Sequence, residues 1–311
     1  MVPRIILAAL MLTANAAHAQ RAELPVRLVD LPNGDRRFST TLTIDGRPVE
    51  VGIDTGSTGL RVLPRGLGDQ AADSGPRVAY SYGSGTAFEG RAVVANVAAG
   101  TIARPVTLMR ITSVGCTARH PDCPVAHMDL PTYGIQGDGI PGQGFAAILG
   151  IRLERDAIDN PFEQLGVRRW IIDLPRTADA VGRIVLNPDD AELAGYARLA
   201  VDGDGTTPGC LIGPQKICGR AIFDTGASGL RVIRAAPFRP WPNDTAITVT
   251  VGTGATVTQG FAATTGRRDQ ATKLLYEPGG ADTRLSLGFA PYFRWSVLYD
   301  PEHHQIGVKT R

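Results

Sequence analysis

One short motif occurs twice in the chain, and this repeat constrains the fold more than any other feature of the sequence. Residues 53–62 read I-D-T-G-S-T-G-L-R-V, and 170 positions later residues 223–232 read F-D-T-G-A-S-G-L-R-V. A single D-T-G is a weak signal, because Asp and Gly turns are common in a chain with 37 glycines. Two copies in a matching apolar frame, one in each half of the chain, indicate a duplicated unit.

Composition and local patterns favour an all-β protein. The 311 residues exceed what one hydrophobic core usually organises, and a hydrophobic content of 43% excludes a disordered chain. Many glycines and prolines, with few long amphipathic helical patterns, favour short strands joined by turns. Apolar and polar residues alternate over 38–53 around Asp45-Gly46, which predicts a hairpin leading into the first D-T-G, and a second hairpin is expected over 211–223. Each motif Asp is therefore expected on a tight loop between two strands.

The first residues predict export from the cell. Arg4 precedes an apolar stretch over 5–12, and Ala-rich sequence then ends in A-H-A at 17–19. This is the pattern of a cleavable secretory signal peptide over residues 1–19, with an apolar stretch too short to span a bilayer. Cleavage would leave Gln20 first, with no cysteine there to accept a lipid, so we expect a secreted or periplasmic protein without a membrane anchor. The formal net charge of +2 gives no electrostatic reason to expect a nucleic-acid partner.

Four cysteines form two close pairs along the chain. The pairs are Cys116 with Cys123 and Cys210 with Cys218. Each pair closes a small loop, and exported proteins oxidise their thiols, so two local disulfides are the expected pairing. The alternative is a zinc site, because His120 and His127 lie near the first pair, although zinc sites usually space their cysteines more tightly.

Beyond the two motifs, several segments carry a resemblance to a known family, the bilobal pepsin-like aspartic proteases, which are related to the retroviral proteases. Residues 144–150, G-F-A-A-I-L-G, resemble the family's hydrophobic-hydrophobic-Gly segment beneath the first Asp loop, and residues 285–307 resemble its C-terminal segment. Residues 160–165 resemble its short helix, with Asn as N-cap and Pro at the first position. Residues 170–174 and 182–186 resemble the crossover between its lobes. The resemblance covers nearly the whole chain after the predicted signal peptide.

The resemblance implies a fold of two related β-barrel-like lobes with an active-site cleft between them. The N-terminal lobe would span 24–172 and carry the first D-T-G, and the C-terminal lobe would span 173–311 and carry the second. The segment 82–85, Y-G-S-G, resembles the tip of the flap, a hairpin that closes over the substrate. The substrate-binding positions that the resemblance implies are Thr55, Gly56, Ser57, Tyr82, Gly83, Ser84, Thr225, Gly226 and Ala227.

The two motif aspartates, Asp54 and Asp224, are the expected catalytic residues. Hydrolysis of an amide needs a base that activates water and an acid that protonates first the carbonyl oxygen and then the leaving nitrogen. Two neighbouring carboxylates that share one proton supply both, because their like charges push the two pKa values apart. The resemblance also implies that Thr55 and Thr225 hydrogen-bond across the lobes. It implies an aspartic endopeptidase that acts on peptides or proteins as a monomer, with no metal or other cofactor.

Two positions depart from the family pattern. Arg61 stands where the family usually carries the Trp that braces the flap tyrosine, so the bond from this position to Tyr82 does not carry over. Ala227 stands where single-chain members more often carry Thr or Ser. Asp224 is therefore expected to lack the hydroxyl donor that Ser57 can offer to Asp54, and to keep a higher pKa.

Two other functions remain open on the sequence. Each D-T-G could form an Asx-type turn in a β-sandwich or barrel that serves as a binding module. The chain could also keep the pepsin-like fold without activity, as a peptide- or glycan-binding protein or an inhibitor, although both aspartates are present. Cleavage of an unfolded protein between acidic and neutral pH separates the enzyme from both alternatives.

Overall fold

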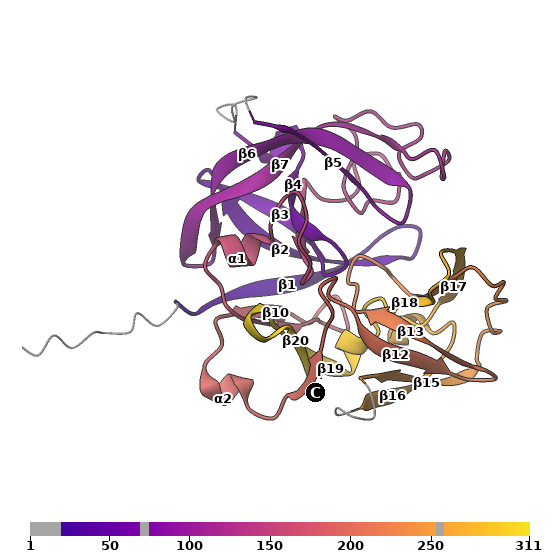
Figure 1. Cartoon of the computed structure of the whole chain (residues 1–311). Helices are drawn as coiled ribbons and strands as arrows, with labels where there is room; N and C mark the ends of the chain where they lie inside the picture. The colour runs from indigo at the N-terminus through magenta and orange to yellow at the C-terminus, as the bar shows by residue number, and fades with distance from the viewer. Residues whose placement is uncertain (1–19, 69–74, 253–257) are drawn as a thin grey trace, which may run out of the picture.

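The computed structural model describes residues 20–68, 75–252 and 258–311, and within them the protein consists largely of β-strands (Figure 1). This part of the chain contains two one-turn α-helices, α1 (Pro161–Gln164) and α2 (Asp190–Leu193). It also contains four short 3-10 turns, at Pro64–Gly66, Arg268–Gln270, Pro291–Phe293 and Pro301–His303. The expected all-β class is confirmed.

The larger of two sheets has thirteen strands, and part of it closes into a ring. Its strand order is β11 (Ala197–Ala200), β20 (Gln305–Thr310), β19 (Trp295–Asp300), β9 (Trp170–Asp173), β10 (Gly182–Leu186), β1 (Ala22–Asp30), β2 (Arg36–Ile44), β3 (Arg47–Asp54), β8 (Ala147–Ile151), β4 (Thr58–Val62), β7 (Ile102–Cys116), β6 (Thr86–Ala99) and β5 (Arg77–Ser81). An additional pairing places Thr43 of β2 opposite Ala98 of β6. Six strands, β2-β3-β8-β4-β7-β6, therefore form a ring in the first half of the chain.

The second sheet belongs to the second half of the chain. Its seven strands have the order β16 (Gln259–Thr264), β15 (Ala246–Val251), β12 (Thr207–Ile212), β13 (Lys216–Ile222), β18 (Arg284–Ser286), β14 (Leu230–Arg234) and β17 (Leu274–Pro278). Figure 1 shows this sheet at the lower right, below the ring of the first half.

The repeated sequence adopts a repeated strand arrangement. Strand β3 leads into the first D-T-G and β4 leaves it, while β8 pairs parallel to β3 and antiparallel to β4. In the second half β13 and β14 flank the second D-T-G, and β18 pairs with them in the same two directions. A further parallel neighbour, β7 beside β4 and β17 beside β14, completes the match. Both D-T-G segments lie on the loop between two strands, as expected.

Local signals in the sequence position these strands. Strands β2 and β3 are joined by Asp45 and Gly46, both with positive φ, as expected for a tight Asp-Gly hairpin turn. Strands β12 and β13 form the second expected hairpin, with the disulfide-bonded Cys210 and Cys218 directly opposite each other. The side chain of Asn160 accepts a hydrogen bond from the backbone at the start of α1, which confirms the predicted N-cap.

The two halves of the chain share strands of one sheet and one hydrophobic core. The six strands β11, β20, β19, β9, β10 and β1 come from the start, the middle and the end of the chain, and the boundary expected between residues 172 and 173 falls inside β9. Phe38 of β2 makes edge-on ring contacts with Phe289 and Phe293, at 5.1 and 6.3 Å between ring centroids. These contacts fix one half against the other, so the loops at their junction have a defined geometry.

Two findings bear on the compartment of the protein. Both expected disulfides are present, as is compatible with an extracellular or periplasmic protein. Among the described residues, neither helix has the length and apolar character needed to cross a bilayer. The predicted signal peptide, residues 1–19, lies outside the described residues and stays a prediction.

Candidate active site

The two D-T-G loops meet face to face, one from each half of the chain. A Cβ atom placed on Gly226 would lie 2.7 Å from Oδ1 of Asp54 and 3.2 Å from Oδ1 of Asp224. A Cβ on Gly56 would overlap the same oxygen of Asp224. Both glycines are therefore required by the close approach of the two loops, and the two carboxylates face one small space.

Two threonines interlock the loops. The Oγ1 atom of Thr55 donates to the carbonyl of Phe223 at 2.8 Å and accepts from the N–H of Thr225 at 3.0 Å. Thr225 does the same in return, donating to the carbonyl of Ile53 at 2.9 Å and accepting from the N–H of Thr55 at 3.0 Å. The expected hydrogen bonds between the two halves are thus confirmed. Because all four are buried, water does not compete for them, and they hold the aspartate loops at a fixed separation.

The carboxylate of Asp54 is oriented by two donors from its own loop. The N–H of Gly56 donates to Oδ1 at 2.8 Å, and the hydroxyl of Ser57 donates to Oδ2 at 2.6 Å. Asp54 and Ser57 are both buried. One donor on each oxygen fixes the plane of the carboxylate and favours its ionised form.

The carboxylate of Asp224 has a matching pair of donors, but its hydroxyl comes from another strand. The N–H of Gly226 donates to Oδ1 at 3.0 Å, and the hydroxyl of Ser286 at the end of β18 donates to Oδ2 at 3.1 Å. The expectation that Ala227 leaves this carboxylate without a hydroxyl donor is therefore wrong. The signal in the sequence was a lone polar residue in the apolar run L-S-L-G at 285–288.

Burial raises the pKa values of both carboxyls, and the negative charge of Asp54 raises that of Asp224 further. Burial raises the pKa of Asp54, an effect that the Ser57 hydroxyl and the positive charge of Arg61 reduce. Burial, together with the negative charge of Asp54, raises the pKa of Asp224 to about 6, against a smaller lowering by Ser286. The two groups lie close enough to titrate as one pair.

Arg61 lies buried beside this pair. Its side chain is 1% exposed, and its guanidinium stacks on the ring of Tyr80, 3.4 Å from the centroid. It also donates to Asp156 at 3.0 Å and to the carbonyl of Gly59 at 3.3 Å. The position that carries Trp in the resembling family therefore holds a buried cation under an aromatic side chain of β5.

Tyr82 is held by ring contacts instead of a hydrogen bond. Its ring meets those of Tyr80 and Phe88 edge-on, at 4.8 and 5.3 Å between centroids. Its buried hydroxyl has no hydrogen-bond partner among the described residues. The guanidinium of Arg61 lies on the ring of Tyr80 and is 5.9 Å from the centroid of the Tyr82 ring. No hydrogen bond runs from position 61 to the hydroxyl of Tyr82.

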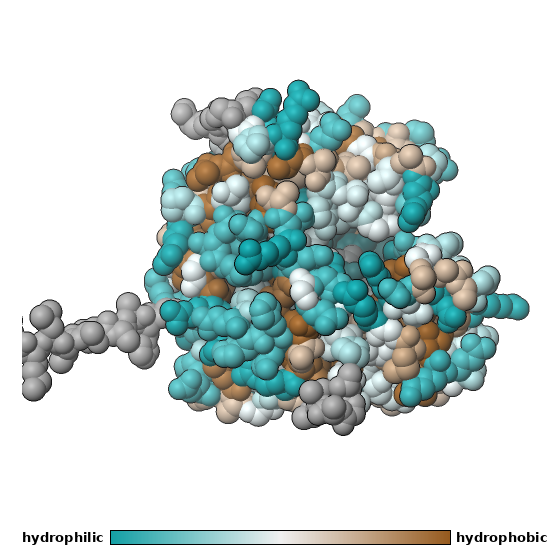
Figure 2. Space-filling view, in the orientation of Figure 1, coloured by the Kyte–Doolittle hydropathy of each residue, from teal (hydrophilic) through white to brown (hydrophobic). Residues whose placement is uncertain are grey.

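The predicted flap tip is the turn between β5 and β6. The N–H of Gly85 donates to the carbonyl of Tyr82 at 2.9 Å and closes the turn, which leaves Gly83 and Ser84 exposed. A Cβ on Gly83 would lie 3.7 Å from Nη1 of Arg231 on β14. The tip of this hairpin therefore reaches from the first half of the chain to the second. Figure 2 shows the surface hollowed between the two halves, to the right of centre.

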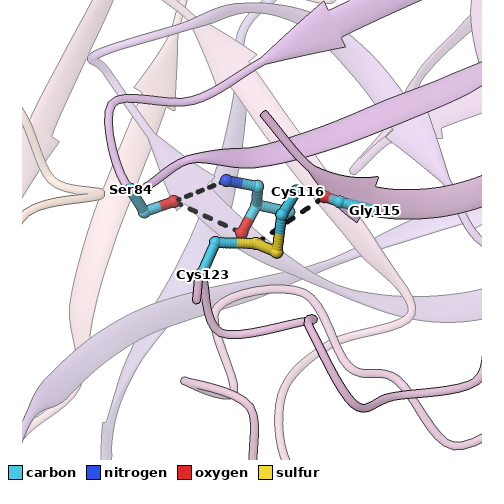
Figure 3. The surroundings of a disulfide bond; sticks show 5 residues. Ser84, Gly115, Cys116 and Cys123 are labelled. Atoms are coloured by element: carbon cyan, nitrogen blue, oxygen red, sulfur yellow. Dashed lines mark hydrogen bonds between the residues drawn. A yellow bond between two sulfur atoms is a disulfide. The ribbon is translucent and has the colours of Figure 1, made fainter. Parts of the chain in front are cut away.

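A disulfide braces the base of this turn. Cys116 at the end of β7 is bonded to Cys123, and Figure 3 shows Ser84 of the turn beside this bridge. The N–H of Thr117 donates to the carbonyl of Gly85 at 2.8 Å. The disulfide therefore holds the loop after β7 to the end of that strand, and the bond from Thr117 holds the start of the same loop to the hairpin tip. The zinc alternative is wrong for this pair, because the two sulfur atoms are bonded to each other.

A pair of buried tyrosines supports the loops, and the sequence analysis missed it. The hydroxyl of Tyr292 donates to Oγ1 of Thr55 at 2.9 Å and also contacts the hydroxyl of Tyr299. Tyr292 lies in the turn before β19, and Tyr299 lies on β19. Two tyrosines among the apolar residues near the C-terminus gave no sign that they lie under the first D-T-G loop, 237 positions away.

The predicted site residues thus lie in two groups. The residues of the D-T-G segments are brought together around the two carboxylates. Tyr82, Gly83 and Ser84 lie at the turn of the β5–β6 hairpin, whose tip reaches Arg231 in the second half of the chain. We compared the chain with models of protein families and with curated proteins, and neither comparison finds a match. The case for a function therefore comes from the geometry of this site.

Proposed function

We propose that the protein is an exported aspartic endopeptidase with the bilobal pepsin-like fold, and that Asp54 and Asp224 form its catalytic dyad. One observation carries the proposal. Two carboxylates from duplicated loops approach each other closely, and each is oriented by one backbone N–H and one hydroxyl. Burial raises the pKa of both carboxyls, and the charge of Asp54 raises that of Asp224 further, which suits a pair that shares one proton.

In this mechanism the dyad acts as base and acid in turn. The ionised carboxyl takes a proton from a water molecule as that water attacks the peptide carbonyl carbon, and the protonated carboxyl gives its proton to the carbonyl oxygen. The tetrahedral intermediate then carries two hydroxyls, and as it collapses the carboxyl that is now ionised takes a proton back from one of them. The C–N bond breaks, and the carboxyl that is now protonated passes its proton to the leaving nitrogen. The pair ends with one proton, as it began. Raised pKa values suit this task, because the acid must stay protonated until the carbonyl is attacked.

The substrate of this enzyme would be an extended peptide. It would lie in the hollow between the halves, under the β5–β6 hairpin, where the exposed turn at Gly83 and Ser84 can contact its backbone. The rigid base that the Cys116–Cys123 disulfide gives to this turn supports a fixed distance between hairpin and dyad. Polar backbone contacts of this kind hold a peptide with little regard for its side chains.

A second candidate is a peptide- or glycan-binding protein, or an inhibitor, that keeps this fold without activity. The buried charge of Arg61 favours it, as does the Tyr82 hydroxyl, which lacks a hydrogen-bond partner in the part of the chain that the structure describes. Both differ from the arrangement expected of an active flap. The intact pair of aspartates and their donors favours the enzyme.

Cleavage of peptides separates the two. The purified chain without residues 1–19 is incubated with a peptide library between pH 3 and 8, and products are identified by mass spectrometry. We expect internal cleavage that a pepstatin-type inhibitor blocks and that Asp54→Asn or Asp224→Asn removes. Cleavage that persists in either variant, or binding of peptides without cleavage at any pH, contradicts the peptidase proposal.

The export proposal has its own measurement. The protein recovered from the periplasm or medium of a producing cell should begin at or near Gln20, as read by N-terminal sequencing. Recovery of a chain that still carries residues 1–19 from the cytoplasm would overturn it.

A further inference from the structure

The two halves of the molecule supply a hydroxyl to their aspartate from different places. In the first half Ser57, three residues after Asp54, donates to Oδ2 at 2.6 Å. In the second half the equivalent position is Ala227, and Ser286 donates to Oδ2 of Asp224 at 3.1 Å. In both halves the other oxygen, Oδ1, accepts from the backbone N–H two residues further on.

Strand register identifies the position from which the second hydroxyl comes. Ile148 of β8 lies opposite Arg61 of β4, and Ser286 of β18 lies opposite Arg231 of β14. Arg61 and Arg231 are the same position of the repeat, so Ile148 and Ser286 are equivalent as well. The first half thus combines a loop serine with a strand isoleucine, and the second half combines a loop alanine with a strand serine. Each carboxylate receives one hydroxyl in either case.

We propose that Ser286 is a positioning residue of the dyad, which does for Asp224 what Ser57 does for Asp54. As an assignment within catalysis it rests on the proposed peptidase function. The hydroxyl has moved from the loop to the neighbouring strand, and the donor set around the carboxylate has been kept. Ala227 is then a tolerated position and no sign of a weakened site.

The surroundings of Ser286 orient its hydroxyl toward the carboxylate. The N–H of Gly288 lies 3.4 Å from Oγ of Ser286 and points its hydrogen at it, so this oxygen accepts one hydrogen bond from the backbone. The hydroxyl proton is left for the carboxylate of Asp224. Ser286 is 6% exposed, so water does not compete for this bond. A donor held in this way stabilises the ionised form of Asp224 and fixes the plane of its carboxylate.

At position 148 of the first half no hydroxyl is needed. Ile148 is 2% exposed and belongs to an apolar cluster with Leu63, Met109 and Ile111. A serine there would add a hydroxyl that the Asp54 carboxylate, already served by Ser57, does not require. The two halves therefore show two solutions to one requirement.

The test compares three variants with the wild type. Ser286→Ala removes the donor, Ser286→Ala with Ala227→Ser restores one from the loop, and Ser296→Ala is the control. Ser296 is a buried serine of β19 that hydrogen-bonds Tyr196 and touches neither aspartate. Two quantities are measured for each: kcat/KM against pH, and the titration of the aspartate carboxyls by carbon-13 NMR.

We expect Ser286→Ala to raise the pKa of Asp224 by about 1 unit, because one hydrogen bond to the ionised form is lost. The limb of the pH–rate profile where the shared proton is lost should move to higher pH by a similar amount. The double variant should return to the wild-type values, and Ser296→Ala should not depart from them. An unchanged titration in Ser286→Ala, or a shift that Ala227→Ser fails to reverse, would overturn the proposal.

Two further outcomes keep the test decisive. If Ser286→Ala does not fold while the double variant does, the hydroxyl on Asp224 is what the fold requires, which supports the proposal; if neither folds, Ser286 serves packing and the proposal fails. The NMR titration needs no substrate. Wild-type protein that cleaves no peptide but shows the expected shift in Ser286→Ala therefore rejects the peptidase while keeping the contact, and active protein without the shift rejects Ser286 alone.

Discussion

The two arginines of the repeated motif occupy the same place in the sequence and differ in their surroundings. Arg61 is 1% exposed, stacks on Tyr80 and pairs with Asp156. Arg231 is 29% exposed and pairs with Glu277 at 2.8 Å. The β5–β6 hairpin covers the first arginine, and only the tip of that hairpin reaches the second. A repeated motif thus repeats its loop, whereas the environment of each copy is made by elements outside the motif.

The largest effect should come from the part in which the copies are alike. Asp54→Asn and Asp224→Asn should each lower kcat/KM by at least about a thousandfold, because each removes half of one proton-sharing pair. The double variant should be scarcely worse than either single variant. The measurement is kcat/KM on one peptide at the optimum pH.

The control for this prediction is the fold of each variant, followed by circular dichroism and thermal unfolding. An Asn variant that folds and keeps a tenth of the wild-type rate would mean that its aspartate does not act in the chemistry. Unequal losses in the two halves would mean that the dyad does not work as one unit.

A smaller effect should separate the two arginines. Arg61→Met should lower the free energy of unfolding by about 3 kcal/mol, because it removes a buried cation from its ion pair and from Tyr80. Arg231→Met should cost less than about 1 kcal/mol, because its ion pair is partly exposed. Urea unfolding of both variants measures the difference. Equal losses would show that the cover provided by the β5–β6 hairpin has no energetic consequence.

Whether the sequence predicts an interaction here depends on how far apart its two residues lie along the chain. The hairpin turn at Asp45-Gly46, the cap of α1 at Asn160 and the two disulfides depend on residues at most eight positions apart, and all are confirmed. The D-T-G repeat also predicts two equivalent loops. The bonds between Thr55 and Thr225 came from resemblance to a family, because no local pattern implies them.

The features that the sequence does not predict are contacts between segments that lie far apart along the chain. The hydroxyl of Ser286 reaches Asp224 from 62 positions away, and nothing in the short run around Ser286 shows which residue it faces. The burial of Arg61 depends on Tyr80 and Asp156, which lie on different segments. Side chains of this kind are positioned by packing of whole sheets, which a reading of neighbouring residues does not supply.

The raised pKa of Asp224 predicts a dependence of stability on pH. A carboxyl with a pKa of about 6 in the folded state, against an ordinary value of 3.8, binds its proton more tightly when folded. Its contribution to stability is fully present below about pH 4 and is lost as the pH rises through 6. Relative to the wild type, Asp224→Asn should therefore gain about 2 kcal/mol between pH 4 and pH 7.5, somewhat less than the full shift because the unfolded carboxyl is already partly ionised at pH 4.

Urea unfolding of the wild type and Asp224→Asn at both pH values measures this gain, with the exposed Asp179→Asn as control for the loss of one carboxylate. If Asp224→Asn instead loses stability relative to the wild type as the pH rises, the folded state lowers the pKa of Asp224. The size of the gain also tests how the two halves differ. The Asp54 carboxylate has a shorter hydroxyl contact than the Asp224 carboxylate, and the charge of Arg61 lowers its pKa.

The smallest effect concerns the one contact that the two interlocking threonines do not share. Thr55 and Thr225 make the same bonds to each other's loops, but only Thr55 also accepts a hydrogen bond from Tyr292. Tyr292→Phe keeps the ring and removes this donor, and it should lower the free energy of unfolding by about 1 kcal/mol, the net worth of one hydrogen bond. Because the four bonds that Thr55 and Thr225 make to each other's loops remain, kcat/KM should change by less than about threefold, well below the effect of losing the dyad.

Urea unfolding and kinetics on one peptide test both parts, with Tyr196→Phe as a control for the loss of a tyrosine hydroxyl that bonds Ser296 and neither threonine. A loss of activity as large as that of the Asp variants would show that the tyrosine takes part in the chemistry, and that the asymmetry between the two halves extends to the threonines themselves.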